Sequence, residues 1–215
     1  MEAIRIVSVN AGSAETISLG NRSMTTGINK LGIEGRIRVS EAGLESDVIC
    51  DRKHHGGADQ AIYVYSVDDY AWWSAQLGRE LRSGTFGENL TIEGLPRDMN
   101  VGDRLLIGDV ILETTSPRIP CRTLSAQMQD RNFGLAFRRA ERPGFYFRVL
   151  NGGDVGAGDA VTFVENPGCD VSTLELFRLH YEIHPQPETL QKMLAAPVAE
   201  RMRANLERKL AASAR

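Results

Sequence analysis

A single cysteine stands in a proline-stiffened loop between two arginines, in the run Ser116-Pro-Arg-Ile-Pro-Cys121-Arg122. Each proline fixes its own φ and biases the residue before it toward extended backbone, so the loop presents Cys121 with reduced conformational freedom. A thiol beside cations has a lowered pKa and acts as a nucleophile or as a soft-metal ligand. The alternative is a small cysteine that fills a gap in the core, beside arginines that only solvate a turn. The loop alone leaves both interpretations open.

Two basic residues, two imidazoles and two glycines lie together in the segment Asp51-Arg-Lys-His-His55-Gly-Gly-Ala-Asp59. Glycines let a backbone approach a ligand closely and expose N–H donors to an anion, so Gly56 and Gly57 are candidate ligand contacts. Histidine supplies a proton near neutral pH, and Lys53 can hold a phosphate. Because neighbouring side chains alternate in an extended segment, one imidazole is expected to be functional and the other structural. A histidine hydrogen-bonded across a Gly-Gly turn is the alternative.

Three further segments contain polar residues or glycines at turn positions. Phe86-Gly-Glu-Asn-Leu90 places an amide where a loop enters a strand, and Asn89 either orients a ligand or satisfies its own backbone. Thr26-Gly-Ile-Asn-Lys30 adds a glycine followed by a cation. Gly153-Asp-Val-Gly-Ala-Gly-Asp159 looks like a phosphate loop, but it lacks a following Lys-Ser/Thr and leads into a strand. We therefore predict a turn there.

The elements that must position these residues are mainly β-strands up to about residue 165. Short β-prone runs punctuated by glycine predict an antiparallel or mixed barrel rather than βαβ repeats. Gly108-Asp109 between two such runs predicts a hairpin. The expected strands span residues 4–9, 61–65, 104–107, 110–114, 145–150 and 160–164, and the expected helices span residues 67–77, 122–129 and 133–140.

The pattern changes to helical after Asn166-Pro-Gly168. Ser172 and Glu175 have the spacing of a capping box, which predicts a helix to about residue 180. Pro187 and Pro197 can each open a further helix. The sequence thus predicts a β domain over residues 1–166 and a three-helix tail over residues 167–215. Such a tail is small for an independent core and is expected to dock on the barrel or on a second subunit.

Composition and charge fit an ordinary globular protein of 215 residues, with 42% hydrophobic and 25% charged residues. The net charge of −3 gives no reason to expect duplex nucleic acid or an anionic membrane as a partner. Cys50, Cys121 and Cys169 are an odd number without paired spacing, which argues against a disulfide framework and a structural zinc site. No charged leader with an apolar stretch opens the sequence, so a cytoplasmic location is expected.

In order along the chain, these segments resemble the MOSC family, the domain named for the C-terminal part of molybdenum-cofactor sulfurase, and in particular its YiiM-type members. The motifs that carry the resemblance are Thr26-Gly-Ile-Asn-Lys30, Ala42-Gly-Leu-Glu-Ser-Asp47, Arg52-Lys-His-His-Gly-Gly-Ala-Asp59, Phe86-Gly-Glu-Asn-Leu90, Ser116-Pro-Arg-Ile-Pro-Cys121 and Gly144-Phe-Tyr-Phe-Arg148. The tail looks like the three-helix appendage of that subgroup. Two departures stand out: no lysine precedes Gly27, and Ser46 stands where a glycine is usual.

The resemblance implies a MOSC-type β-barrel with peripheral helices, whose basic, glycine-lined cleft holds the pterin-based molybdenum cofactor; pyridoxal phosphate is not expected. On that reading Cys121 is the protein ligand to molybdenum and, with His55, a catalytic residue. Cations would neutralise the cofactor's phosphate, and His55 and Asn89 would orient the pterin or the substrate. The implied cofactor-binding residues are Lys30, Lys53, His55, Gly56, Gly57, Asn89, Arg118 and Arg148.

YiiM-type proteins are associated with reduction of N-hydroxylated compounds, including hydroxylaminopurine base analogues, to amines. The resemblance therefore implies an oxidoreductase that takes a small N-hydroxylated substrate and receives electrons from a separate donor reductase; a homodimer is a further expectation. The alternative is a carrier of molybdenum cofactor or sulfur without reductive turnover, with Cys121 as a transient persulfide. In a third hypothesis the barrel is a structural scaffold and the helical tail carries the functional surface. This hypothesis requires Cys121 to be dispensable for function.

Overall fold

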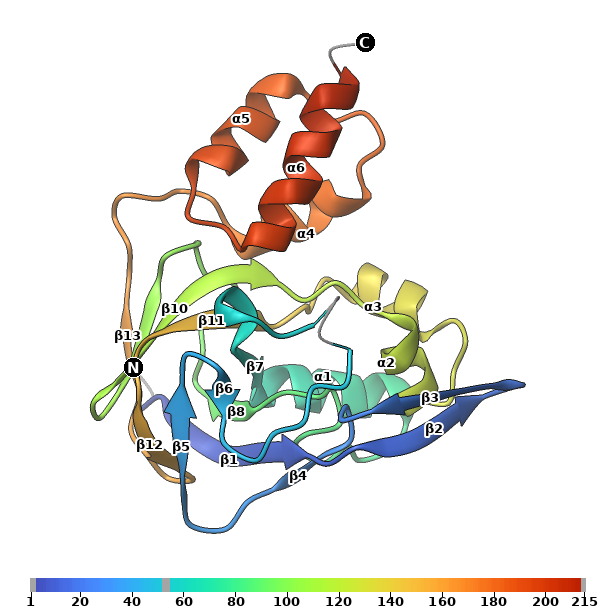
Figure 1. Ribbon diagram of the computed structural model, residues 1–215, viewed down its shortest axis with the longest axis vertical. Helices are drawn as coiled ribbons and strands as arrows, with labels where there is room; N and C mark the ends of the chain where they lie inside the picture. The colour runs from blue at the N-terminus through green and yellow to red at the C-terminus, as the bar shows by residue number, and fades with distance from the viewer. Residues whose placement is uncertain (1–2, 52–54, 214–215) are drawn as a thin grey trace.

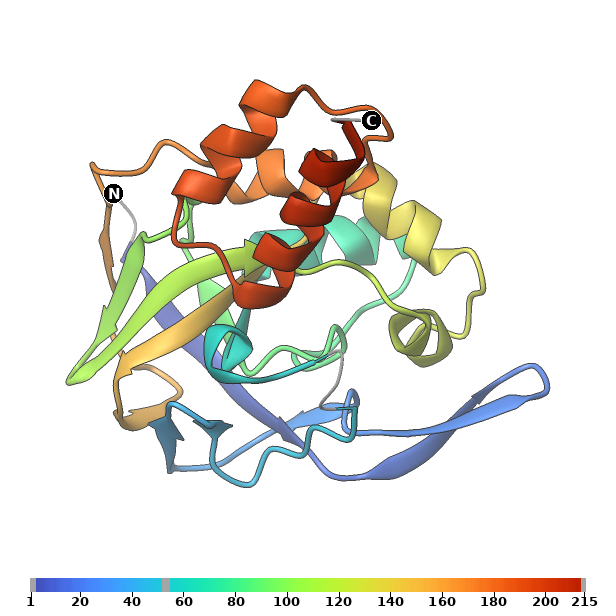
Figure 2. The same cartoon turned by 45° about the horizontal axis from the view of Figure 1, so that its top comes forward.

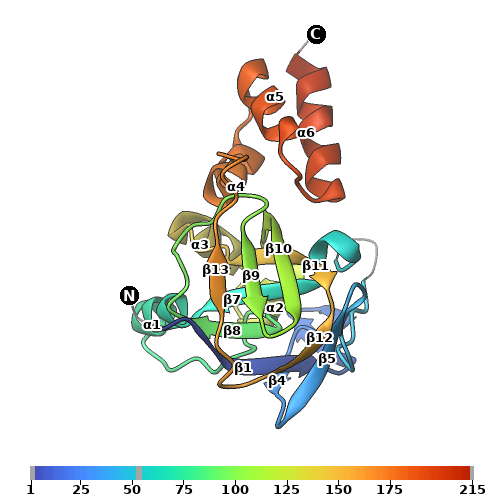
Figure 3. The same cartoon turned by 90° about the vertical axis from the view of Figure 1, so that its left-hand side faces the viewer.

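The computed structural model describes residues 3–51 and 55–213, which form a curved β part with three helices standing on one end (Figures 1 and 3). The largest sheet has the strand order β13 (Thr162–Val164), β9 (Arg104–Ile107), β10 (Val110–Pro117), β11 (Phe145–Asn151), β7 (Ile62–Ser66), β8 (Leu90–Glu93), β1 (Arg5–Gly12) and β4 (Lys30–Gly32). β7 and β8 are parallel, and the other neighbours in this sheet are antiparallel. The predicted mainly β fold with helices is confirmed.

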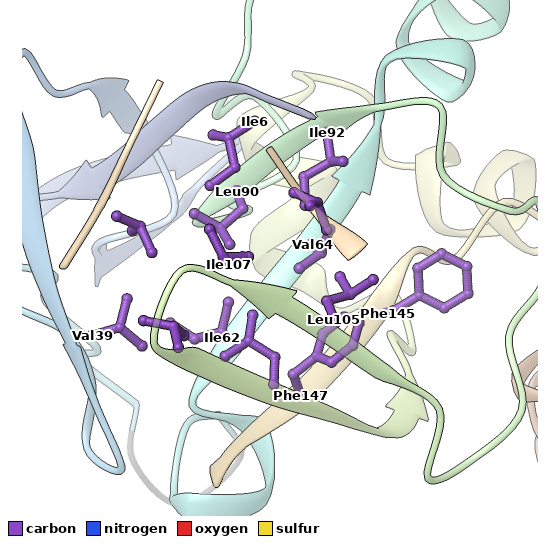
Figure 4. Close-up of a cluster of buried hydrophobic side chains, with 14 of the residues drawn as sticks. Ile6, Val39, Ile62, Val64, Leu90, Ile92, Leu105, Ile107, Phe145 and Phe147 are labelled. Atoms are coloured by element: carbon purple, nitrogen blue, oxygen red, sulfur yellow. The ribbon is translucent and has the colours of Figure 1, made fainter. Parts of the chain in front are cut away.

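The sheet bends around one apolar core, shown in Figure 4, to which strands on opposite sides contribute. Its curvature brings the beginning of β1 against the segment before β13, where Arg5 forms an isolated bridge with Ala160. The Ile6 N–H also donates to the Asp159 carbonyl at 3.0 Å. Loop hydrogen bonds and one bridge, rather than a continuous strand ladder, therefore join the two sides of the expected barrel.

Two smaller sheets complete the β part. One contains β12 (Gly153–Gly156), β5 (Arg36–Ser40) and β6 (Gly43–Leu44), and the other is a hairpin of β2 (Glu15–Leu19) and β3 (Arg22–Thr26) that extends away from the body in Figure 1. The prediction of a turn over residues 153–159 is thus wrong for its first half, because β12 pairs with β5 there. The turn itself follows at Gly158, whose φ is 90°.

Three helices pack around β7 and enclose an aromatic cluster: α1 (Val67–Leu77), α2 (Arg122–Gln127) and α3 (Phe133–Ala140). α1 begins where the Ser66 hydroxyl accepts from the Asp68 N–H, and it ends at Gly78 in the left-handed conformation. The hairpin of β9 and β10 turns at Gly108, with φ 55°, as the sequence predicts. These elements hold the loop of Cys121 between β10 and α2.

The C-terminal helices are α4 (Thr173–Tyr181), α5 (Pro187–Ala195) and α6 (Glu200–Ser213). The predicted capping box is present: the Ser172 hydroxyl accepts from the Glu175 N–H, and the Glu175 carboxylate accepts from the Ser172 N–H. The helices share an apolar core to which Val101 of the β part contributes, so the tail docks on that part. No helix within residues 3–51 and 55–213 has the length and apolar content to cross a membrane.

Candidate active site

One cavity of about 660 Å³, open solvent at its mouth included, gathers most of the predicted site residues. It is lined by Thr25, Thr26, Gly27, Ile28, Lys30, Asp47, Val48, Ile49, Cys50, Asp51, His55, Gly56, Gln60, Ala61, Tyr63, Gly87, Asn89, Arg118, Cys121, Thr123 and Tyr146. Each of the six motif segments, which lie far apart in the sequence, contributes to this lining, together with residues near them. The fold therefore brings the motifs to one place.

Cys121 lies half-buried at the first turn of α2, as the N-cap residue with extended backbone. Burial opposes ionisation of its thiol, but a hydrogen bond with His55 and the charge of Arg118 outweigh that effect and lower its pKa to about 6. At neutral pH Cys121 is therefore mainly a thiolate. This supports the activated thiol rather than a cysteine that fills a core gap.

Arg118 is almost completely buried beside Cys121, with 4% of its surface exposed. Its guanidinium donates to the Phe86 carbonyl and lies over the ring of Tyr63, 5.0 Å from the centroid. Its Nε–H has no hydrogen-bond partner among the described residues. A buried cation with an unused donor at a cavity wall is suited to hold an anion.

Lys30 and Asn89 meet at a shared carboxylate, that of Asp47. The Lys30 ammonium donates to Asp47 Oδ2, which also accepts from the Asn89 amide at 2.9 Å, while Asp47 Oδ1 accepts from the Gly12 N–H at 2.9 Å. Burial lowers the pKa of Lys30, and the negative charge of Asp47 opposes that shift. The Asn89 carbonyl oxygen accepts from the Tyr63 N–H at 3.1 Å. Both predicted ligand contacts are thus held in place by protein partners.

The described part of the histidine-glycine segment forms one wall of the cavity. His55 and Gly56 line it, and His55 reaches the Cys121 side chain. Gly57 does not line the cavity; it precedes the short 3-10 helix η1 (Ala58–Gln60). Both glycines have positive φ, 69° and 89°. Lys53 lies outside the described residues, so its role stays a prediction.

Arg148 was predicted as a cofactor contact, but it does not line this cavity. Its guanidinium donates to Asp59 at 3.0 Å, to Glu113 at 3.3 Å and to the Pro197 carbonyl at 3.0 Å. It thus joins β11 to η1 and to the chain segment before α6. The structure assigns it to the seam between the β part and the helical tail.

The two departures from the family pattern have clear positions. Ser46 has φ 63°, in the left-handed region where glycine is favoured, so the turn is kept although a side chain is present. Thr25 lines the cavity without supplying a charge. Gly27 is required by packing, because a Cβ there would lie 1.9 Å from the Val48 carbonyl oxygen. No lysine stands before Gly27, and Lys30 is paired with Asp47. Among the described residues, Arg118 is therefore the buried cation of the cavity without a carboxylate partner.

Among the lining residues that sequence reasoning did not assign to the site are Asp47, Tyr63 and Tyr146. Asp47 ends one of the motifs, and its place in that motif was the available signal. Tyr63 and Tyr146 lie in segments that were predicted as strands, and Tyr146 also lies in the motif that ends at Arg148. Burial raises the pKa of both phenols, so they stay neutral in the cavity.

The curved β sheet and the cavity that gathers the cysteine, histidine and arginine are carried largely by one segment of the chain that matches a known domain. The MOSC domain model matches residues 51–162, and the chain therefore belongs to the MOSC domain family.

Among known proteins the chain is similar to YflK of Bacillus subtilis (strain 168), with 28% identity over 210 residues that cover 97% of this chain and 95% of the relative. It is also similar to YiiM of Escherichia coli (strain K12), with 25% identity over 79% of this chain and 77% of the relative. A protein of Gibberella moniliformis named "Reductase" is 30% identical over 81% of this chain, which spans only 32% of that longer protein.

Solved structures agree with the fold. The crystal structure of YiiM from Geobacillus stearothermophilus has a TM-score of 0.80, with 26% identity, and the match covers 96% of this chain and 99% of that one. YiiM from Escherichia coli has a TM-score of 0.73, with 18% identity over 93% and 92% of the two chains, which supports the fold alone. The resemblance to YiiM-type MOSC proteins is confirmed.

Proposed function

We propose that this chain is a molybdenum-cofactor-dependent reductase that converts small N-hydroxylated compounds, such as hydroxylaminopurine bases, to amines. The observation that carries the proposal is the Cys121 thiol, with a pKa of about 6, in a cavity between His55 and the buried Arg118. Membership of the MOSC family and similarity to a protein named "Reductase" support the class of reaction.

The residues of the cavity fit a pterin-based molybdenum cofactor. A thiolate is the soft ligand that such a metal takes, and Cys121 is ionised at neutral pH. The orphaned Nε–H of Arg118 is a donor for an anionic group such as the cofactor's phosphate. Gly27 and Gly87 also line the cavity, where the absence of side chains allows the wall to pack against Val48 and Ile28.

On this proposal Cys121 ligates the metal, and Arg118 holds the phosphate together with Lys53. Lys30, held by Asp47, contributes little free charge, so its part is to keep Asn89 and Asp47 in position. The bound cofactor supplies the two-electron redox chemistry that the side chains of this cavity cannot supply themselves.

The chain's own residues would deliver protons and orient the substrate. Reduction of R–NHOH to R–NH₂ and water consumes two electrons and two protons, and the electrons come from a separate donor reductase. His55, at the cavity wall beside Cys121, is placed to deliver a proton to the leaving hydroxyl. Tyr63 and Tyr146 remain neutral, and the nearly buried Tyr63 ring lies against Arg118 and Tyr146 and so supports the guanidinium that would bind the anion. A reducing cytoplasm would keep Cys121 available as a thiolate.

The experiment is reconstitution of the full chain with molybdenum cofactor, followed by reduction assays with an artificial electron donor. The panel contains N-hydroxylated bases, amidoximes and, as a negative control, the corresponding amines. We expect amine product from the N-hydroxylated bases. Loaded protein that reduces none of them contradicts the proposal.

The low pKa of Cys121 also favours a second candidate, a carrier of sulfur or cofactor without turnover. Mass spectrometry of the protein after incubation with a sulfur donor distinguishes the two. A stable persulfide on Cys121 in protein that reduces no N-hydroxylated compound would support the carrier.

A further inference from the structure

The first turn of α6 lies beside η1, close to the cavity wall that carries His55 (Figures 2 and 3). Residues 55–60 and α6 are about 140 positions apart in the sequence, and the link between them is polar. The helical tail therefore contacts the loop that forms this wall of the candidate site.

Arg201 makes the central contact of this link. Its Nη1 donates to the Gly56 carbonyl and to Gln60 Oε1, both at 2.7 Å, and its Nη2 donates to the His55 carbonyl at 3.4 Å. Gly56 and Gln60 line the cavity together with His55. One guanidinium thus spans both ends of the loop that forms this wall, which the planar fork of arginine allows.

Hydrogen bonds hold the two ends of the loop: the His55 N–H donates to the Asp51 carbonyl at 3.0 Å and the Thr115 hydroxyl donates to the Asp59 carbonyl at 2.6 Å, whereas the glycines between them bring no side chain of their own. Gly56 and Gly57 have positive φ and no side chains, and a Cβ added at Gly57 would meet nothing within 4 Å among the described atoms. Paired glycines give a backbone many accessible conformations. The donors of Arg201 to the His55 and Gly56 carbonyls therefore help to hold the glycine part of this loop in one of them.

The tail has anchors that do not depend on Arg201. The Glu200 N–H donates to Asp59 at 2.8 Å, the Ala199 N–H donates to the Thr115 carbonyl at 3.2 Å, and Arg148 donates to the Pro197 carbonyl. The apolar core of the tail also includes Val101 of the β part. Loss of the Arg201 side chain therefore leaves the tail docked and affects mainly the loop.

We propose that Arg201 is a positioning residue that holds the His55–Gln60 wall in the conformation in which His55 faces Cys121, so that the C-terminal helices form part of the site. This inference deepens the proposed function. It rests on that function in one respect, namely that the cofactor binds in this cavity. The geometry of the wall can be measured without the cofactor.

The test uses the full chain and the variants Arg201→Ala, Arg201→Lys and Arg203→Ala. Arg203 is the matched control, because it lies on the same helix and donates to the Leu194 and Ala196 carbonyls inside the tail. Amide hydrogen exchange of cofactor-free protein should become about tenfold faster over residues 55–60 in Arg201→Ala, because charged hydrogen bonds to that loop are lost. Arg201→Lys should restore part of the protection, and Arg203→Ala should leave these residues unchanged.

Molybdenum retained after gel filtration of reconstituted protein is the second measurement. We expect Arg201→Ala to retain less than half of the wild-type amount and Arg203→Ala to retain all of it. Unchanged exchange over residues 55–60 in Arg201→Ala would overturn the proposal, as would equal loss of protection in Arg203→Ala. Faster exchange with full molybdenum retention would overturn the functional part. If wild-type protein bound no molybdenum, the proposed function would fail while the exchange result still decided the role of Arg201.

Discussion

The Lys30 ammonium donates a hydrogen bond to the Asp47 carboxylate, and the two side chains are only 7% and 5% exposed. The same carboxylate accepts from Asn89 and from the Gly12 backbone, so Asp47 joins β1, β4 and the start of β8. Because Asp47 neutralises Lys30, the positive charge available to an anionic ligand in the described cavity comes mainly from Arg118. Lys30, which the motif offers as a phosphate contact, thus lines the cavity with its charge paired to Asp47.

Replacing Asp47 with alanine should destabilise the protein strongly. It leaves a buried ammonium without its partner, a change that costs about 3–5 kcal/mol in comparable buried pairs. Urea unfolding gives the free energy. Asp154→Ala is the control, because Asp154 faces Arg38 at 3.8 Å in an exposed pair, and its loss should change the free energy by about 0–1 kcal/mol. If the two substitutions lowered the free energy of unfolding by the same amount, the buried pair of Lys30 and Asp47 would not be important for stability.

The alkylation rate of Cys121 should follow a titration with a midpoint of about pH 6. Only the thiolate reacts, so the rate should be near its maximum above about pH 7 and fall about tenfold for each unit below the midpoint. Iodoacetamide labelling of cofactor-free protein, followed by mass spectrometry of the Cys121 peptide, measures it.

The variant His55→Gln should move that midpoint upward, toward the ordinary thiol value of 9.0, because it removes the hydrogen bond that contributes most to the lowering. His180→Gln is the matched control, since His180 lies in α4 and does not line the cavity. A wild-type midpoint above pH 8, or the same midpoint in wild type and His55→Gln, would contradict the arrangement described here.

Glu88 should make the protein less stable as the pH rises. Its Oε1 accepts from Tyr70, Gly84 and Thr91, while its buried Oε2 has no partner among the described residues. Burial raises its pKa above the ordinary 4.5, so the folded state keeps a proton that the unfolded chain loses. Stability from this group is complete below pH 4.5 and is lost as the pH rises toward the folded pKa.

The variant Glu88→Gln cannot titrate, and its unfolding free energy relative to wild type should therefore increase between pH 5 and pH 8. Urea unfolding at several pH values checks this. Glu93→Gln, at the exposed end of the adjacent strand β8, is the control. Parallel pH profiles for wild type and Glu88→Gln would show that Glu88 is not held protonated.

Much of the fold could be predicted because its local signals are strong. α1 and α3 have the predicted bounds, since Ser66 caps one helix and the spacing of Phe133 and Phe137 buries one face of the other. The strands β2 to β6 carried no such signal. β3 is mostly exposed in the projecting hairpin, and β6 has only two residues, so neither shows a clean alternation of apolar and polar side chains.

The site could be predicted where a motif carried it. Cys121, His55, Arg118 and Asn89 were each marked by unusual neighbours in the sequence, and the fold brings them to one cavity. Arg148 was predicted with them but lies outside this cavity, and its partners, Asp59, Glu113 and the Pro197 carbonyl, come from three distant segments. The local spacing of residues does not predict such long-range pairing. The same holds for the contact of Arg201 with residues 55–60.

The central claim is that Cys121 holds the molybdenum cofactor in this cavity. Metal analysis of reconstituted wild type, Cys121→Ser and Cys50→Ser tests it most directly, because Cys50 also lines the cavity and is the matched control. We predict that Cys121→Ser folds normally but loses most of its molybdenum and its reductive turnover, since a hydroxyl is a poor ligand for this metal. Cys50→Ser should behave as wild type. Full molybdenum content and full turnover in Cys121→Ser would contradict the account.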